Sequence, residues 1–491
     1  MLGANLNVRT LVFFALSSLL SASYAQRVVM SNKPQMYERR TLYHKALGEN
    51  EEGIYTLNYS SLDVGDGFNI EWYDPEFRFL HERHIEGPKG QQVIKVFLNK
   101  DRIQWLCMDS RKRDSAQLVL YSLNGQLEGD IQSIALGKLP FQSIDLDQVN
   151  VDFSADRQHL IFLALADHSS GSQLHMRSFN TLEGLLVAAK DTVLSLRDND
   201  WYWYASDANN SGDELAVLRL YQSTKSIARS NYDKESMVCF WNGASLKVFP
   251  FLQEQVIGDL DVVAHPSQRL FCLAGLYNGK EATESKGSFR CVVDSTDKWS
   301  EQLHPWTDAV LTLLVGEKAR KKGVLPEHFQ VRKLFWLSDG GLSMVLEQFY
   351  ESKQMETYYL NGVPQTSTKT LYTFGDICIA LTGRSGVSDT AILVRKNQVA
   401  SPSNSFLLGL GVCQTDSELH IIYNDDIARS NRVMDAIIGP DARIRRVALL
   451  DSENTYSTIV PEDGRQTAFG SFILPIYRDK QWYWMQLLTY D

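Results

Sequence analysis

The chain has 491 residues, of which 44% are hydrophobic and 11% aromatic, and this composition excludes disorder over most of its length. Its formal net charge of −10 argues against nucleic acid as the main partner, because phosphate binding needs a basic surface. The one basic stretch, Lys318, Arg320, Lys321 and Lys322, is more typical of a solvated connecting loop than of an anion site.

The first 25 residues have the features of a cleavable secretory signal peptide. Arg9 supplies the positive charge, the apolar run TLVFFALSSLL follows it, and Ser23 and Ala25 place small residues where signal peptidase reads. That run is about half as long as a membrane-spanning helix. The residue directly after the cleavage site is Gln26 and not a cysteine, which argues against a lipid anchor of the bacterial type, and no later stretch is apolar enough to span a bilayer. We therefore expect an exported, soluble chain in the periplasm or outside the cell, beginning at Gln26.

Short strand-like segments follow one another through the rest of the chain. Runs rich in aromatic and β-branched residues, such as GIYTLNYS from Gly53 and VIKVFL from Val93, are bounded by Gly, Asn, Asp or Ser, which is typical of strands and turns. The clearest helical pattern is NTLEGLLVAAK from Asn180, where Leu182, Leu185 and Leu186 would share one face. The absence of long helices between strands argues against a parallel α/β fold.

A degenerate repeat of strand, polar turn and strand begins at Val151, Trp203, Leu260 and Lys333, with spacings of 52, 57 and 73 residues. These spacings are close to the length of a propeller blade with variable loops. They predict an all-β protein, a β-propeller of about seven four-stranded blades, with six or eight blades also possible. A pair of β-sandwich domains would also give regularly spaced strands. We expect one body over residues 26–491, with residues 316–328 as the best candidate seam.

The six cysteines, at positions 107, 239, 272, 291, 378 and 413, include no C-x-x-C pair, so a zinc or thioredoxin-like site has no support. Export would permit disulfides, and Cys272 with Cys291 is the best candidate pair because two strand-like runs carry them around a polar loop. Each cysteine also has apolar neighbours, which favours buried free thiols.

Two local patterns resemble metal sites. Asp207 to Gly212 matches the first half of a calcium loop, but Leu218 stands where the bidentate acid belongs, and an interstrand turn explains the same residues. In His81-Glu82-Arg83-His84 the two histidines would point to opposite faces of a strand, which favours an exposed polar edge over a metal site. The sequence therefore predicts no metal ligand.

Carboxylates for glycoside hydrolysis cannot be chosen from the sequence. Such enzymes place two acids about 5 to 10 Å apart across a cleft, and different blades could supply them. The candidates are Asp145, Asp147, Asp152, Asp200 and Glu214. Trp201 and Trp203 could form a platform for a sugar, although core packing against the next blade is the favoured use.

The last quarter of the chain carries a resemblance to a family. Gly375-Asp376-Ile377, Lys396-Asn397-Gln398, LHIIYNDD from Leu419 and Asn431 together resemble the closing part of uncharacterised exported propeller-like proteins of Bacteroidota. The resemblance implies a signal peptide, a propeller-like fold and an envelope or extracellular address, and it transfers no catalytic residue. Taken alone, LHIIY predicts a buried strand, and Asn424-Asp425-Asp426 predicts a turn that bonds local backbone.

No nucleophile elbow, Walker A loop, dinucleotide fingerprint or H-E-x-x-H helix occurs. The favoured function is therefore a non-catalytic binding or scaffold module of the cell envelope, with no cofactor and with a protein or glycan as partner. The alternative is a carbohydrate-active hydrolase or lyase that uses acids at the propeller channel. A polar channel with converging acids and exposed aromatic side chains would favour the enzyme, and an apolar plug would exclude it.

Overall fold

The computed structural model describes residues 27–489 apart from several segments. These segments are residues 36–42, 61–66, 113–114, 141–147, 155, 169–170, 195–200, 221–235, 250, 252–254, 279–283, 316–320, 322, 327–328, 338–339, 361–362, 383–387, 416–417, 426, 428–431, 440, 451–456, 468–470 and 479. The predicted signal peptide and most of the basic stretch lie outside the described residues, so both stay predictions.

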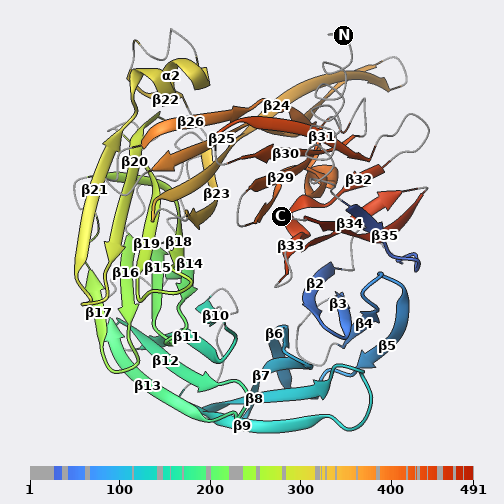
Figure 1. Cartoon of the computed structure of the whole chain (residues 1–491), viewed down its shortest axis with the longest axis vertical. Helices are drawn as coiled ribbons and strands as arrows, with labels where there is room; N and C mark the ends of the chain where they lie inside the picture. Colours follow the sequence, from blue (N-terminus) through green and yellow to red (C-terminus); the bar gives the residue numbers. More distant parts are fainter. Residues whose placement is uncertain are drawn as a thin grey trace, which may run out of the picture.

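The described strands form eight antiparallel sheets arranged as the blades of a ring (Figure 1). The first four blades are β2 (Tyr43–Asn50), β3 (Gly53–Tyr59), β4 (Phe68–Tyr73) and β5 (Phe79–Ile85); β6 (Gln91–Asn99), β7 (Arg102–Lys112), β8 (Ser115–Asn124) and β9 (Gln132–Leu139); β10 (Val149–Phe153), β11 (His159–His168), β12 (Gly171–Asn180) and β13 (Leu186–Leu194); and β14 (Trp201–Ala208), β15 (Glu214–Leu220), β16 (Ser236–Trp241) and β17 (Leu246–Phe249).

Blades five to seven each contain four main strands, and two of them gain a short extra strand. They are β18 (Val256–Ala264), β19 (Phe271–Asn278), β20 (Glu284–Val293) and β21 (Trp299–Pro305) with β22 (Leu325–Pro326); β23 (Phe329–Trp336), β24 (Leu342–Leu360), β25 (Val363–Thr382) and β26 (Ser388–Val394) with β27 (Gln398–Ala400); and β28 (Gly411–Gln414), β29 (Leu419–Asn424), β30 (Val433–Ile438) and β31 (Ile444–Leu450). The described helices are α2 (Asp308–Val315) and the single-turn segments η2 (Pro402–Leu407) and η3 (Pro461–Asp463).

Both ends of the chain build the eighth blade. It consists of β32 (Ser457–Ile459), β34 (Ser471–Arg478) and β35 (Gln481–Leu488), with β33 (Arg465–Gln466) beside β34 and β1 (Arg27–Met30) beside β35. The antiparallel pairing of Arg27 with Leu488 closes the ring. The predicted β-propeller is therefore confirmed, and its eight blades are the upper limit of the predicted range. Because the eighth blade takes strands from both ends of the chain, it is not a contiguous repeat in the sequence and is easily left out of the blade count.

Apolar clusters between adjacent blades form the core. Leu163 of the third blade packs in one cluster with Trp201, Leu218 and Cys239 of the fourth, and Trp203 packs against its edge. Each fully buried side chain of this size stabilises the fold by roughly 1.5–3 kcal/mol. The core-packing interpretation of Trp201 and Trp203 is confirmed.

One expectation about local structure is wrong. The segment from Asn180 is a turn followed by β13, and Leu182 and Leu185 are exposed, because a hairpin between two outer strands overrides the short helical pattern. Cys272 pairs across the sheet with Val292, and Cys291 pairs with Leu273, so the two thiols lie on opposite faces in separate clusters. All six cysteines are buried and none forms a disulfide, which confirms the interpretation of packed thiols.

The exposed-edge interpretation of the histidine pattern is confirmed, since His81 and His84 are exposed on β5, the outermost strand of its sheet. The predicted buried strand LHIIY is also confirmed as part of β29. Among the described residues, no helix is long and apolar enough to cross a membrane.

Candidate functional site

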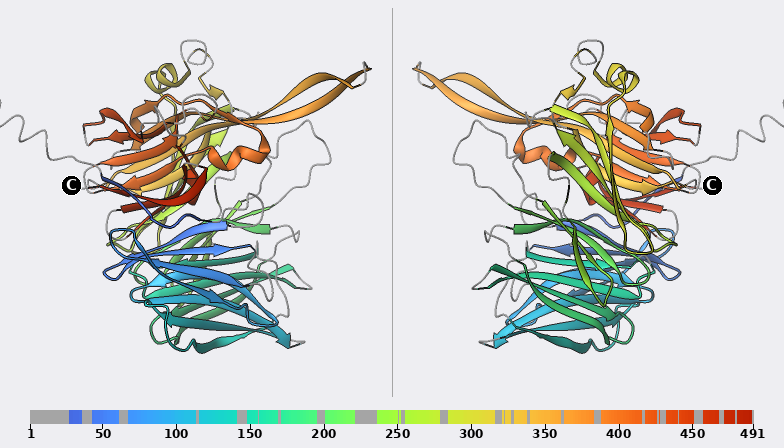
Figure 2. Two further views of the ribbon diagram at one scale, coloured as in Figure 1. Left: turned by 90° about the vertical axis from the view of Figure 1, so that its right-hand side faces the viewer. Right: turned by 90° about the vertical axis from the view of Figure 1, so that its left-hand side faces the viewer.

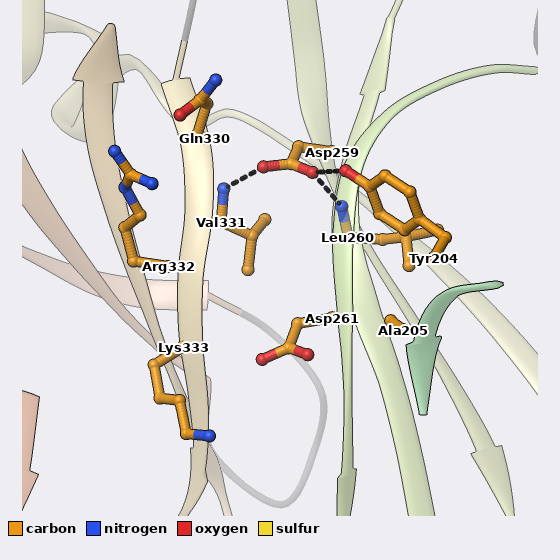
Figure 3. A pocket seen from close by; sticks show the side chains of 9 residues that line it. All are labelled: Tyr204, Ala205, Asp259, Leu260, Asp261, Gln330, Val331, Arg332 and Lys333. Carbon is orange, nitrogen blue, oxygen red and sulfur yellow. Dashed lines mark hydrogen bonds between the residues drawn. The ribbon is translucent and has the colours of Figure 1, made fainter. Parts of the chain in front are cut away.

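In blades one to seven the first strand of each sheet faces the centre of the ring, and we call these inner strands the channel wall (Figure 1). Two adjoining cavities lie along this wall. A cavity of about 440 Å³ lies between β14, β18 and β23 (Figure 3). A second, of about 540 Å³, shares Arg332 and Lys333 with the first and continues onto β28, η3 and β33. The first cavity is lined by Tyr204, Ala205, Asp259, Leu260, Asp261, Gln330, Val331, Arg332 and Lys333. The channel wall is therefore polar and charged at these cavities.

Irregular register explains how the inner strands present so many polar groups. In β2, β6, β14, β18 and β23 the pairing with the next strand shifts near the middle of the strand. A bulge of this kind breaks strict alternation and re-aims side chains. The shift between Val331 and Lys333, for example, allows the consecutive residues Arg332 and Lys333 both to line the cavities.

Acidic side chains on the inner strands hold neighbouring blades together. Asp259 accepts hydrogen bonds from the Tyr204 hydroxyl and from the backbone N–H of Val331 on the next blade, at 2.7 Å for Val331 (Figure 3). Asp207 does the same one blade earlier, because its Oδ2 accepts from the N–H of Ala264 at 2.8 Å. We call these two carboxylates the interblade clips. Burial raises the pKa of Asp207 to about 6, against the opposing effect of that backbone hydrogen bond.

Two of the acids proposed for glycoside hydrolysis meet beside the clips. Asn150 Nδ2 donates to Asp152 Oδ2 at 2.8 Å and to Glu214 Oε1 at 3.1 Å, and the Ser206 hydroxyl also donates to Asp152. Burial, and then the charge of Asp152, raise the pKa of Glu214 well above its ordinary value. The buried Oε2 of Glu214 meets no donor among the described residues.

This pair does not have the geometry of a glycosidase. Carboxyl groups that cleave a glycosidic bond stand about 5 to 9.5 Å apart so that the sugar fits between them. The side-chain amide of Asn150 instead stands between Asp152 and Glu214 and donates to both of them. Asp145, Asp147 and Asp200 lie outside the described residues. Sequence spacing gave no means of finding the meeting of Asp152 and Glu214, because the two acids come from different blades.

The calcium-like loop is an interstrand turn between β14 and β15. Asn209 Oδ1 accepts from the N–H groups of Ser211 at 2.9 Å and Asp213 at 3.0 Å. Asn210 bonds outward to both neighbouring blades, accepting from Asp156 N and donating to Pro266 O. The oxygens that calcium would need are therefore engaged with backbone groups, and the turn interpretation is confirmed. Among the described residues, no group of three or more potential metal ligands occurs.

A second candidate site lies away from the channel. Figure 2 shows the orange hairpin of β24 and β25 projecting far beyond the ring. We define the hairpin arm as residues 350–360 and 363–372. β23 pairs with β24 only as far as Gln348, and β27 pairs with β25 only over Tyr372 to Phe374. Over most of its length, no described strand therefore pairs with either edge of the arm.

Large apolar side chains are exposed on both faces of the arm. Met355 is 79% exposed, Tyr359 73%, Leu360 60% and Tyr358 50%. Strand alternation places Met355 and Tyr359 on one face and Tyr358 and Leu360 on the other. An isolated two-stranded hairpin is marginally stable in water, and exposed apolar patches of this kind mark interaction surfaces.

The hairpin arm was not predicted from the sequence. The signal that could have found it is the pair Asn361-Gly362 between two long runs of strand-forming residues, since this dipeptide favours a tight hairpin turn.

Residues that carried the family resemblance anchor the root of the arm. Buried Lys396 forms an ion pair with Glu347 of β24 and donates to Gln398 Oε1 at 2.8 Å. Gln398 in turn donates to the carbonyl of Asn424. The Asn424 side chain donates to Leu407 O at 2.8 Å and to Ile459 O at 2.9 Å. The prediction that Asn424 bonds local backbone is therefore wrong, because its amide reaches across to the eighth blade, and Asp426 lies outside the described residues.

Eight radial sheets closed by the N-terminal strand define a β-propeller. No family model and no curated protein matches the sequence.

Solved propellers resemble the chain in structure. The Dos1 propeller is 7% identical with a TM-score of 0.43, covering 91% of this chain and 95% of that one. Sqt1 of Chaetomium thermophilum, bound to the N-terminus of the ribosomal protein L10, is 8% identical with a TM-score of 0.44, covering 94% and 98%. The polysaccharide lyase Uly1 is 11% identical with a TM-score of 0.37, covering 83% and 94%. Such likeness concerns the fold alone and assigns no ligand or reaction.

Proposed function

We propose that the chain is an exported propeller that binds a protein of the cell envelope, and that the hairpin arm is the element that holds this partner. The observation that carries the proposal is the arm itself, which exposes apolar and aromatic side chains on both faces. Natural proteins usually protect open strand edges, because such edges pair with other chains. A partner that clasps the arm would cover its faces and could extend its sheet.

The charge of the arm favours a protein over a membrane surface. Lys353 and Lys369 are balanced by Glu351 and Glu356, so the arm has no net charge from these residues. Binding to anionic lipid draws on a cluster of basic residues. Tyrosine and methionine are instead enriched at the centres of protein interfaces, where charge is depleted.

The hydrolase alternative requires acids on the channel wall that are available to a substrate, and the described acids there are engaged by other groups of the chain. Asp207 and Asp259 are bonded to backbone groups of the following blade, and Asp152 and Glu214 both accept from the side-chain amide of Asn150. We therefore retain the binding function and do not carry the enzyme forward.

The test is a comparison of two variants of the tagged mature chain in pull-downs from envelope extracts. The arm variant replaces Met355, Tyr358 and Tyr359 by serine. The control variant replaces Leu182 and Leu185 by serine, because these leucines are 51% and 59% exposed on a hairpin elsewhere. We expect a defined partner to be retained by the wild type and the control and reduced at least tenfold with the arm variant.

Three results would overturn the proposal. The first is equal recovery of every partner by all three proteins. The second is concentration-dependent self-association that the arm variant abolishes, measured by light scattering, because it would make a second copy of this chain the occupant. Binding of the arm to anionic vesicles with no protein partner would likewise contradict the proposal.

The predicted export is tested in a separate experiment. Expression of the full chain in a Gram-negative host should yield a product whose mass corresponds to an N-terminus at Gln26, in the periplasm or the medium. An intact chain retained in the cytoplasm would contradict the export and would leave the experiment on the arm unaffected.

A further inference from the structure

The two edges of the hairpin arm differ in the backbone groups that they offer. β24 and β25 pair as far as Leu360 and Val363, which leaves two residues between the strands. In a turn of this length the first residue accepts a hydrogen bond from the fourth, so Leu360 and Val363 form a hydrogen-bonded pair. Such pairs alternate along an antiparallel ladder, and the residues between them point their N–H and C=O groups outward, to the edges of the arm.

The outward backbone groups on β24 form a long row. β23 pairs with β24 only as far as Gln348, so none of the described strands covers this row. A row of this length is sufficient for one added strand, because strands in proteins are typically about five to six residues long. From the alternation, the row consists of the N–H and C=O groups of Glu351, Lys353, Met355, Thr357 and Tyr359.

The outward row on β25 is shorter. Pro364 lies in this row and has no N–H to offer at the edge. At the other end, β27 already pairs with β25 at Tyr372. The outward N–H groups between these two limits belong to Thr366, Thr368 and Thr370. The β25 edge is therefore a poorer template for another strand than the β24 edge.

The exposed apolar side chains of the arm follow the same division. Residues 364–370 of β25 are a proline followed by glutamine, threonine, serine and lysine. Side chains on directly neighbouring strands interact, at Cβ separations of about 4.5–5.5 Å. A strand added beside β24 would therefore pack against apolar and aromatic side chains, whereas one beside β25 would meet mainly threonines. The large hydrophobic side chains exposed on the arm all belong to β24, among the described side chains, and are Tyr350, Met355, Tyr358, Tyr359 and Leu360.

We infer that the partner protein adds an extended segment as a strand to the β24 edge of the arm, over residues 351–359. This inference rests on the proposed function, because it states how the same arm holds the partner. In strand addition the backbone groups supply affinity and the neighbouring side chains supply specificity. Apolar side chains stand on both faces of β24 near the tip, so the recognised segment is rich in β-branched and aromatic residues there.

A matched pair of proline substitutions tests which edge is used. Thr357 of β24 and Thr366 of β25 stand directly opposite each other, and both are exposed. Thr357→Pro removes an outward N–H from the β24 edge and Thr366→Pro removes one from the β25 edge, while the hydrogen bonds within the hairpin use neither group. In the pull-down from envelope extracts, we expect Thr357→Pro to reduce recovery of the partner at least tenfold.

Two variants serve as controls for this loss. Thr366→Pro should keep recovery of the partner within about threefold of the wild type, because the inference leaves the β25 edge unused. Thr357→Val, which changes the side chain and keeps the N–H, should do the same. Equal losses with Thr357→Val and Thr357→Pro would overturn the inference, because the side chain and not the backbone group would then bind.

Hydrogen exchange of the wild type provides a measurement that needs no variant. It compares the free chain with the complex eluted from the pull-down. The partner should slow exchange of the outward amides of Lys353, Met355 and Thr357, and should leave those of Thr366 and Thr368 fast. Unchanged exchange of the β24 amides in the complex would overturn the inference even if Thr357→Pro fails to fold.

The results separate the inference from the proposed function. If the arm variant loses the partner while Thr357→Pro and Thr366→Pro both retain it, the proposed function stands and the inference is overturned, because the faces alone hold the partner. A larger loss with Thr366→Pro than with Thr357→Pro also overturns it, because β25 would be the paired edge. If the arm variant recovers the partner as well as the wild type does, both the proposed function and the inference fail.

Discussion

The channel wall and the hairpin arm are both built from antiparallel strands, but their side chains have different roles. On the inner strands, acids such as Asp259 accept hydrogen bonds from the next blade, so polar groups serve to join sheets. On the arm, Tyr359 and Met355 stand in solvent, and no strand of the described chain covers them. The comparison indicates that stability resides in the ring, and that the arm is retained for what it contacts.

The largest effect on stability should follow removal of the closing strand. Deleting residues 27–31 would expose the edge of β35 and remove the packing of Val28 and Met30 against the cluster of the eighth blade. From the apolar burial and the lost backbone hydrogen bonds we expect a loss of about 5 kcal/mol. Chemical denaturation measured by tryptophan fluorescence should show it, and an unchanged midpoint would mean that β1 does not close the ring.

An interblade clip should have the next largest effect. Asp259→Ala would leave the Tyr204 hydroxyl and the Val331 N–H without their acceptor in a half-buried place. Unsatisfied groups of this kind cost about 1–3 kcal/mol each. We expect a loss of about 3 kcal/mol in the free energy of unfolding. Asp441→Ala, at an exposed turn, serves as the control and should change little.

The raised pKa of Glu214 predicts a dependence of stability on pH with a definite sign. Because the folded state raises the pKa of Glu214, the folded chain binds a proton that the unfolded chain releases above about pH 4.5. The stability that this bound proton contributes is fully present below the pKa of Glu214 in the unfolded chain, and it is lost as the pH rises through the higher pKa of Glu214 in the folded chain. Glu214→Gln can still accept the hydrogen bond from Asn150 and carries no charge. The free energy of unfolding of this variant should therefore equal or exceed that of the wild type at pH 7 and depend less on pH.

Denaturant titrations of both proteins at pH 5 and pH 8 would measure this difference. If the variant loses stability at pH 8 and keeps the pH dependence of the wild type, Glu214 is ionised in the folded chain. Such a result would also weaken the comparison drawn above, because the channel wall would then hold an uncompensated carboxylate pair.

The fold could be predicted because alternation and turn residues act locally. GIYTLNYS and LHIIY form strands as their patterns predict, and repeats with variable loops still indicate blades. The sites could not be predicted, because they depend on register and on contacts between blades. The bulge before Lys95 and the meeting of Asp152 with Glu214 leave no pattern in neighbouring residues. Buried Lys396, similarly, is explained only by its partner Glu347 on another strand.

The smallest effect on stability should come from the arm, and it is the most informative one. Tyr359→Ser removes a side chain that is 73% exposed, so the free energy of unfolding should change by less than about 0.5 kcal/mol. Hydrogen exchange should show the amides of the arm exchanging faster than those of β19, which is buried along its whole length. A large loss of stability would instead mean that the tip packs against the chain, and the arm would then belong to the core and could not serve as a free docking element.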